Sequence, residues 1–364
     1  MSLAVSVWLL LAAAPTTRPY AQQTVRDQCF LYAADNGNPW AMAHGITAFG
    51  PEYPAKDGRK ATDAIVHDFL LHAPPDAGPG ATYAFDKFAK DGTPIEPHTN
   101  LIAKTFVLAG MPMGSKLPAK FGTITLQQLV DSVKSSFRHV PQSEAYWLDA
   151  AWTLDLISHQ LTPKNATFKT SDGKTVDFNV VMDDAFTYLE HADSDLQFGL
   201  ERHLPQIDKR KQGIYAHHCG GMHLVQAVLT WARFPEVKKA WGARYDKQVE
   251  VLFYRVDSEN RQYQAALSAA PQYKLQLLTQ ELKFFGHFLE TTGRLHVENG
   301  FKPDELQRQT VAKAKAYLDH ALRELDEEKA FSRMEELKKS NNQIYLDLIG
   351  DSCHASNGWD LWDR

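Results

Sequence analysis

The chain has 364 residues, 44% hydrophobic and 11% aromatic, which is enough apolar material for a large core and excludes a disordered chain. Its formal net charge is −5, and charges of both signs are interspersed. A surface that binds duplex nucleic acid must neutralise phosphates, so this charge pattern excludes nucleic acid as a principal partner.

The N-terminal residues have the pattern of an export signal. Residues 3–14 form a 12-residue apolar run that ends in three alanines, too short to span a bilayer. The run lacks a preceding Lys or Arg and is followed by Pro15, so a buried N-terminal helix is the alternative. We predict a signal peptide over residues 1–21, cleaved between Ala14 and Gln22, and one domain over residues 22–364. No later stretch reaches transmembrane length, so the mature chain is expected to be secreted or periplasmic.

Helical patterns dominate the remaining chain. Asn38-Pro39 is a strong helix start, and Thr125 with Gln128 forms a capping box. Residues 145–161 are apolar on most sides and are predicted to lie inside, whereas residues 304–339 are charged and are predicted to lie outside. Two Asp-Gly turns, at residues 91–92 and 172–173, predict small β-hairpins inserted between helices.

Six histidines recur at nearly regular spacing, each in or beside an apolar segment. They are separated by 54 to 67 residues, a length that accommodates two helices and their loops: His44, His98, His159, His223, His287 and His354. We therefore predict an all-α fold, an α/α toroid of about six helical hairpins whose inner helices line a central cavity. An irregular helical array or two bundles is the alternative.

The segment Tyr215–His223 is the richest in groups that bind metals or move protons. If it is helical, Cys219 and His223 stack on one face, with His218 one residue off it. Gly220 and Gly221 would each cost about 1 kcal/mol in a helix interior. The pair therefore indicates a junction between elements or a close approach by another group.

A second donor pair, Cys353-His354, lies near the C-terminus. Together with Cys219 and His223 it makes a chemically sensible zinc set, with His218 as an alternative fourth ligand. Three protein ligands and a water would make the zinc catalytic, and four would make it structural.

These elements resemble one known family. One Cys followed later by a Cys-His dipeptide, in a helical chain with Ala43-His44-Gly45 and Cys219-Gly220-Gly221, is similar to the lanthionine synthetase C-like α/α toroids. The resemblance implies that fold and a zinc ion held by two Cys and one His. The two cysteine motifs are farther apart here and the family's Trp-Cys element is missing, so the family's reaction is not implied.

A disulfide between Cys219 and Cys353 is the competing interpretation, with the histidines as hydrogen-bonded core residues. An oxidising compartment favours it. Unlinked buried thiols are the third alternative.

Two further pairs are candidate acids and bases. Asp155 and His159 are one helical turn apart, and His287 and Glu290 are neighbours on another helix face. A carboxylate beside an imidazole fixes its tautomer, and an apolar pocket can give either group a pKa suited to proton transfer.

Missing motifs narrow the function. The sequence has no Gly-x-Ser-x-Gly elbow, phosphate-binding glycine loop, haem-attachment motif or His-Glu-x-x-His helix. We predict a zinc-dependent hydrolase or lyase acting on a small or peptide-like substrate. One alternative is a metal-independent enzyme on glycans, with Trp147, Trp152 and Trp359 stacking on sugars. The other is a non-enzymatic binding or scaffold protein.

Overall fold

The computed structural model describes residues 18–74 and 79–364, and these are predominantly helical, as predicted. The predicted signal segment lies almost wholly outside the described residues. Helix α1 begins at Tyr20, and its Ala21 and Gln22 are already buried. Among the described residues, no helix combines the length and apolar character needed to cross a membrane.

Six helices contact one another in a closed succession, because each packs against the next and the last packs against the first. They are α2 (Pro39–Phe49), α4 (Leu101–Leu108), α6 (Glu144–Ser158), α9 (Met222–Trp231), α12 (Lys274–Asn299) and α15 (Asn342–Trp362).

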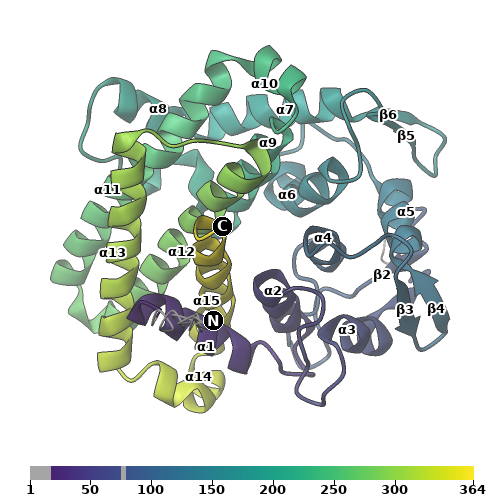
Figure 1. Ribbon diagram of the computed structural model, residues 1–364, viewed down its shortest axis with the longest axis horizontal. Helices are drawn as coiled ribbons and strands as arrows, with labels where there is room; N and C mark the ends of the chain where they lie inside the picture. Colours follow the sequence, from purple (N-terminus) through teal and green to yellow (C-terminus); the bar gives the residue numbers. More distant parts are fainter. Residues whose placement is uncertain (1–17, 75–78) are drawn as a thin grey trace, which may run out of the picture.

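A second set of helices alternates with these six along the chain. Figure 1 shows α3 and α5 outside α2 and α4, and α11 and α13 outside α12 and α15. This set comprises α1 (Tyr20–Tyr32), α3 (Ala61–Phe69), α5 (Leu126–Ser136), α7 (Phe178–Ala192), α11 (Ala243–Ala269) and α13 (Glu305–Glu327). Shorter helices connect them: α8 (Ser194–Glu201), α10 (Pro235–Trp241) and α14 (Met334–Ser340).

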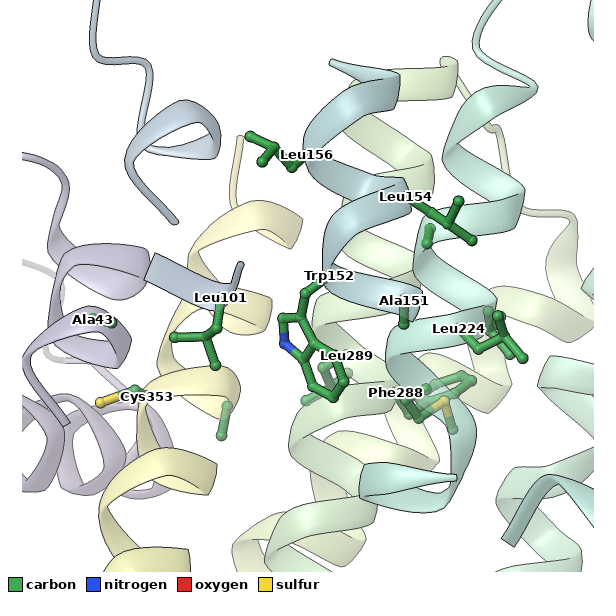
Figure 2. Packing of buried hydrophobic residues seen from close by; sticks show 14 of the residues in the cluster. Ala43, Leu101, Ala151, Trp152, Leu154, Leu156, Leu224, Phe288, Leu289 and Cys353 are labelled. Carbon is green, nitrogen blue, oxygen red and sulfur yellow. The ribbon is translucent and has the colours of Figure 1, made fainter. Parts of the chain in front are cut away.

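Local sequence signals account for several of these elements. Asn38 caps α2 by accepting a hydrogen bond from the Ala41 amide, with Pro39 in the first turn. The Thr125–Gln128 capping box starts α5 as predicted. Helix α6 is buried continuously from Ala150 to Ser158, in keeping with its apolar sequence, and Figure 2 shows Trp152 and other side chains of this part.

The strands form three two-stranded antiparallel pairs. These are β1 (Leu71–His72) with β2 (Tyr83–Ala84), β3 (Lys116–Ala119) with β4 (Gly122–Thr125), and β5 (Thr167–Lys169) with β6 (Thr175–Asp177). The β5–β6 hairpin confirms the prediction at Asp172-Gly173. The Asp91-Gly92 hairpin is reduced to a single bridge between Phe88 and Pro94, since Tyr83–Ala84 pairs with Leu71–His72 instead. The sequence did not predict β3–β4.

Helices α12 and α15 pack unusually closely because glycines face the contact. A Cβ at Gly358 would lie 2.4 Å from the backbone nitrogen of Glu290, and one at Gly286 would lie 3.1 Å from the Asp351 carbonyl oxygen. Only a residue without a side chain permits this approach. It brings the residues around His287 and His354 into contact.

A disulfide joins Cys29 of α1 to Cys353 of α15, with an S–S distance of 2.05 Å. The Cys219–Cys353 disulfide, which was the competing interpretation of these cysteines, is therefore wrong. Cys219 lies before the first residue of α9, and its thiol forms no disulfide. Cys29 and Cys353 instead face each other where α1 packs on α15. The bond ties the first described helix to the last.

Because Cys29 and Cys353 are 324 residues apart, their bond restricts the unfolded chain strongly. We expect a Cys29→Ala/Cys353→Ala double variant to lose about 2–5 kcal/mol of unfolding free energy, measured by denaturant titration. Reductant should lower the stability of the wild type and leave the double variant unchanged. Equal denaturation midpoints for wild type and variant would show that the bond adds no stability.

Candidate metal centre

Three donor groups meet where the start of α9 approaches the middle of α12. The Cys219 sulfur and one ring nitrogen each of His223 and His287 all lie within 4.8 Å of one another. Zinc holds its ligands at about 2.0–2.3 Å, so two ligand atoms of one ion lie at most about 4.6 Å apart. Small side-chain movements would therefore close this group around one ion.

Cys219 reaches the group from an irregular turn and not from the face of α9. Cys219, Gly220 and Gly221 have φ angles of 53°, 59° and 78°, so three successive residues are left-handed. The predicted stacking of Cys219 and His223 on one helix is therefore wrong, because α9 begins only at Met222. The left-handed turn instead brings the Cys219 sulfur close to the ring of His223.

Arg255 of α11 stabilises this turn by a hydrogen bond to its backbone. Its guanidinium donates a hydrogen bond of 2.9 Å to the Gly220 carbonyl oxygen, and the side chain is almost fully buried. Gly221 packs so closely that a Cβ there would lie 2.2 Å from the Ile214 side chain. The thiol of Cys219 therefore has a fixed position.

Hydrogen bonds also fix the tautomers of several rings. His287 Nδ1 donates to the Lys283 carbonyl oxygen at 2.9 Å, and His44 Nδ1 donates to the Trp40 carbonyl oxygen at 2.7 Å. A ring that donates through Nδ1 offers the lone pair of Nε2, which is the usual arrangement of a metal-ligating histidine. Among the described residues, His287 Nε2 and His223 Nδ1 are buried and have no hydrogen-bond partner.

His354 lies beside these rings, with its ring centre 4.0 Å from that of His287 and 5.2 Å from that of His223. Its Nδ1 donates to Glu290 Oε2 at 2.8 Å. Glu290 thus hydrogen-bonds His354 and not His287, the neighbour that the sequence suggested. Gln226 and Asn357 also donate to Glu290, at 2.9 Å and 2.8 Å. These contacts fix the carboxylate, which orients the ring of His354.

Cys353, predicted as a zinc ligand, cannot serve as one because its sulfur is bonded to Cys29. The structure thus brings together two of the predicted ligands, Cys219 and His223, and adds His287, which the sequence had suggested as an acid or base. His354 is adjacent to them but outside the three-donor group.

Asp155 and His159 are not members of the three-donor group. His159 Nδ1 donates to the Asp155 backbone oxygen at 2.7 Å and its Nε2 to Glu298 at 3.0 Å. Arg294 holds both Asp155 oxygens, at 2.7 Å and 3.0 Å. Burial would raise the pKa of Asp155, but Arg294 and Lys104 hold it well below its usual range. These side chains form an ion-pair network away from Cys219, and their catalytic role stays a prediction.

A pocket of about 390 Å³ opens beside the three donors. His44, His98, His218, Cys219, His223 and His354 line it, together with Lys283 and Asp351. His44, His98 and Asp351 were not predicted from the sequence as site residues. His44 and His98 belong to the six regularly spaced histidines, which could have indicated them. Asp351 lies two residues before Cys353, so its position beside a predicted ligand could have indicated it.

Burial sets the protonation of the donors. It lowers the pKa of His223 and His287 well below the usual range, with neighbouring histidines adding to the effect, so both rings are neutral near pH 7. Neutral imidazole is the form that binds metals. Burial raises the pKa of the Cys219 thiol, which a bound cation would reverse.

The tryptophans predicted to stack on sugars are not available for that role. Trp147 and Trp152 are 2% exposed and Trp359 is 6% exposed. The Trp152 ring is covered by His98, whose ring centre lies 4.0 Å away in a parallel plane.

Comparison of the chain with protein-family models, curated proteins and solved structures finds no match.

The tight turn before α9 allows a direct test of how the thiol is positioned. Gly221→Ala places a left-handed alanine against Ile214, whereas Gly300→Ala adds the same type of strain, about 1–2 kcal/mol, in open space. Overpacking should cost Gly221→Ala about 1–3 kcal/mol more. Denaturant titration of both variants measures the difference, and equal losses would show that Ile214 yields and the turn is not constrained.

Proposed function

We propose that this protein is a zinc-dependent enzyme of the hydrolase or lyase type, acting on a small or peptide-like substrate in the pocket beside Cys219. The observation that carries the proposal is the convergence of Cys219, His223 and His287, with two ring nitrogens buried and unpartnered among the described residues. Leaving a buried polar nitrogen unsatisfied costs about 1–3 kcal/mol, and a bound cation would remove that penalty for both rings.

The donor set favours a catalytic over a structural ion. Two histidines and one cysteine leave a fourth tetrahedral position, and Cys219 and His223 line a pocket of about 390 Å³ from which a substrate could reach it. A zinc ion held there would supply a Lewis acid that polarises a carbonyl or phosphoryl oxygen or acidifies a water molecule.

Two pocket residues are suited to accompany that chemistry. Asp351 Oδ2 is buried and has no hydrogen-bond partner among the described residues, and burial raises the pKa of Asp351 well above its usual range. Lys283 lies 3.9 Å from this carboxyl and 3.0 Å from Asp347. We assign Asp351 the movement of a proton to or from substrate, and Lys283 the stabilisation of negative charge in the pocket.

The fold and cellular location complete the proposal. We interpret the closed succession of α2, α4, α6, α9, α12 and α15, each preceded by an outer helix, as an α/α toroid whose centre contains the zinc site. The Cys29–Cys353 disulfide supports folding in an oxidising compartment, in keeping with export by the predicted N-terminal signal.

Metal analysis tests the proposal. Tag-free protein should contain about one zinc per chain, and Cys219→Ser, His223→Ala and His287→Ala should each lose most of it, because each removes one of three ligands. The control is His320→Ala, which removes an exposed histidine of α13 and should retain the metal. Inductively coupled plasma mass spectrometry measures the zinc content, and circular dichroism verifies that each variant is folded.

Cobalt substitution provides a second readout. A thiolate-to-cobalt absorption band should appear in the wild type and be absent in Cys219→Ser, since only Cys219 supplies sulfur. Cys353→Ala should keep both metal and band. Metal-free wild type, or full metal retention by His287→Ala, would refute the proposed centre.

A further inference from the structure

A second, larger pocket of about 720 Å³ lies among the same helices. Five cationic side chains line it, from α1, α4, the end of α9, α12 and the C-terminus: Arg26, Lys104, Arg233, Arg294 and Arg364. Three carboxylates also line it: Glu290, Glu298 and Asp360. The pocket therefore has more positive than negative side chains.

The carboxylates of this pocket are already engaged. Glu298 receives hydrogen bonds from Arg294 at 2.6 Å and His159 at 3.0 Å, and Asp360 pairs with Arg26 at 2.8 Å. Glu290 accepts hydrogen bonds from His354, Gln226 and Asn357. Among the described residues, none of the three carboxylates forms an ion pair with Lys104 or Arg233.

Arg233 is the clearest of the remaining cations. Its guanidinium donates to the backbone oxygens of Thr230 and Ser158, and no carboxylate among the described residues lies within ion-pair distance. The Phe234 ring lies 4.5 Å from the guanidinium carbon and covers one face. Burial lowers the pKa of Arg233, and the charges of Glu298 and Asp155 oppose this shift only in part.

Lys104 is the second of the remaining cations in this pocket. Its side chain is 10% exposed, and among the described residues Asp155, at 3.4 Å, is the carboxylate within ion-pair distance of it. Asp155 already binds both arms of Arg294. Burying a charge without a full partner is costly, so Lys104 and Arg233 both gain from an anion in the pocket.

Lys104 also marks the boundary between the two pockets. A cavity of about 10 Å³ shares Lys104 with the large pocket and shares His223 and His354 with the pocket beside Cys219. That volume holds about one water molecule. The large pocket is therefore distinct from the candidate metal centre, and a ligand in it need not touch the three donors.

We propose that the 720 Å³ pocket binds a small molecule bearing an oxyanion, either a phosphate or a carboxylate, with Lys104 and Arg233 as its principal cations. Arg294, fixed by Asp155 and Glu298, forms the wall beside them. The volume suits a small-molecule ligand. A guanidinium with unused donors matches the geometry of either oxyanion.

Titration calorimetry at constant ionic strength tests this site, with inorganic phosphate and succinate as separate probes. At least one probe should saturate the wild type with one site per chain. Binding by phosphate alone would identify a phosphate ligand, and binding by succinate alone a carboxylate ligand. Arg233→Gln and Lys104→Met should each weaken the affinity about 10-fold or more, because each removes a charge-assisted contact.

The matched control is Arg308→Gln on α13, an exposed arginine paired with Glu305, which should bind as the wild type does. If Arg233→Gln fails to fold, the affinity of Lys104→Met decides the test. This variant should fold, because Asp155 keeps Arg294 as its ion-pair partner. His287→Ala should retain anion binding even if it loses metal, which separates this inference from the proposed zinc centre. Failure of both probes to saturate the wild type, or unchanged affinity in Lys104→Met, would overturn it.

Discussion

The close contact between α12 and α15 is the constraint on which the rest of the site depends. Gly286 and Gly358 allow the two backbones to approach within the distance that any side chain would occupy. The approach places His287 and Glu290 of one helix against His354 of the other. The Cys29–Cys353 disulfide then fixes α15 from its other side, one residue before His354. Backbone packing thus brings the imidazoles together, and the Glu290 carboxylate orients the ring of His354.

Burial of so many imidazoles is the feature that most needs a physical reason. A core histidine normally has both nitrogens hydrogen-bonded, because an unsatisfied buried nitrogen is costly. His44, His287 and His354 each use Nδ1 for a fixed acceptor, as a ligating ring does. His287 Nε2 and His223 Nδ1 then have no partner in the described part of the chain. One nitrogen of the His223 ring and one of the His287 ring lie within 4.8 Å of the Cys219 sulfur, a convergence that a purely structural cluster would not require.

The sequence predicted those features that depend on local signals. The helix start at Asn38-Pro39, the Thr125 capping box and the β5–β6 hairpin are short-range patterns, and all three are confirmed. The spacing of the histidines followed the alternation of helices. The Cys29–Cys353 pairing was not predictable, because it depends on how α1 meets α15 across 324 residues. The left-handed Cys219 turn was missed because its conformation is held by Arg255 and Ile214, which lie outside the segment.

Charge balance explains why the two pockets have different characters. The proposed zinc, with one thiolate and two neutral imidazoles, would have a net charge of +1, and the nearby Lys104 and Lys283 would oppose it. Carboxylates placed behind the rings offset this repulsion: Glu290 contacts His354, and Asp347 pairs with Lys283. The excess positive charge that remains is at Lys104 and Arg233, on the side away from the thiol. An anion bound there would lower the electrostatic penalty of placing a cation at the three donors, so the two sites should stabilise each other across the one-water cavity.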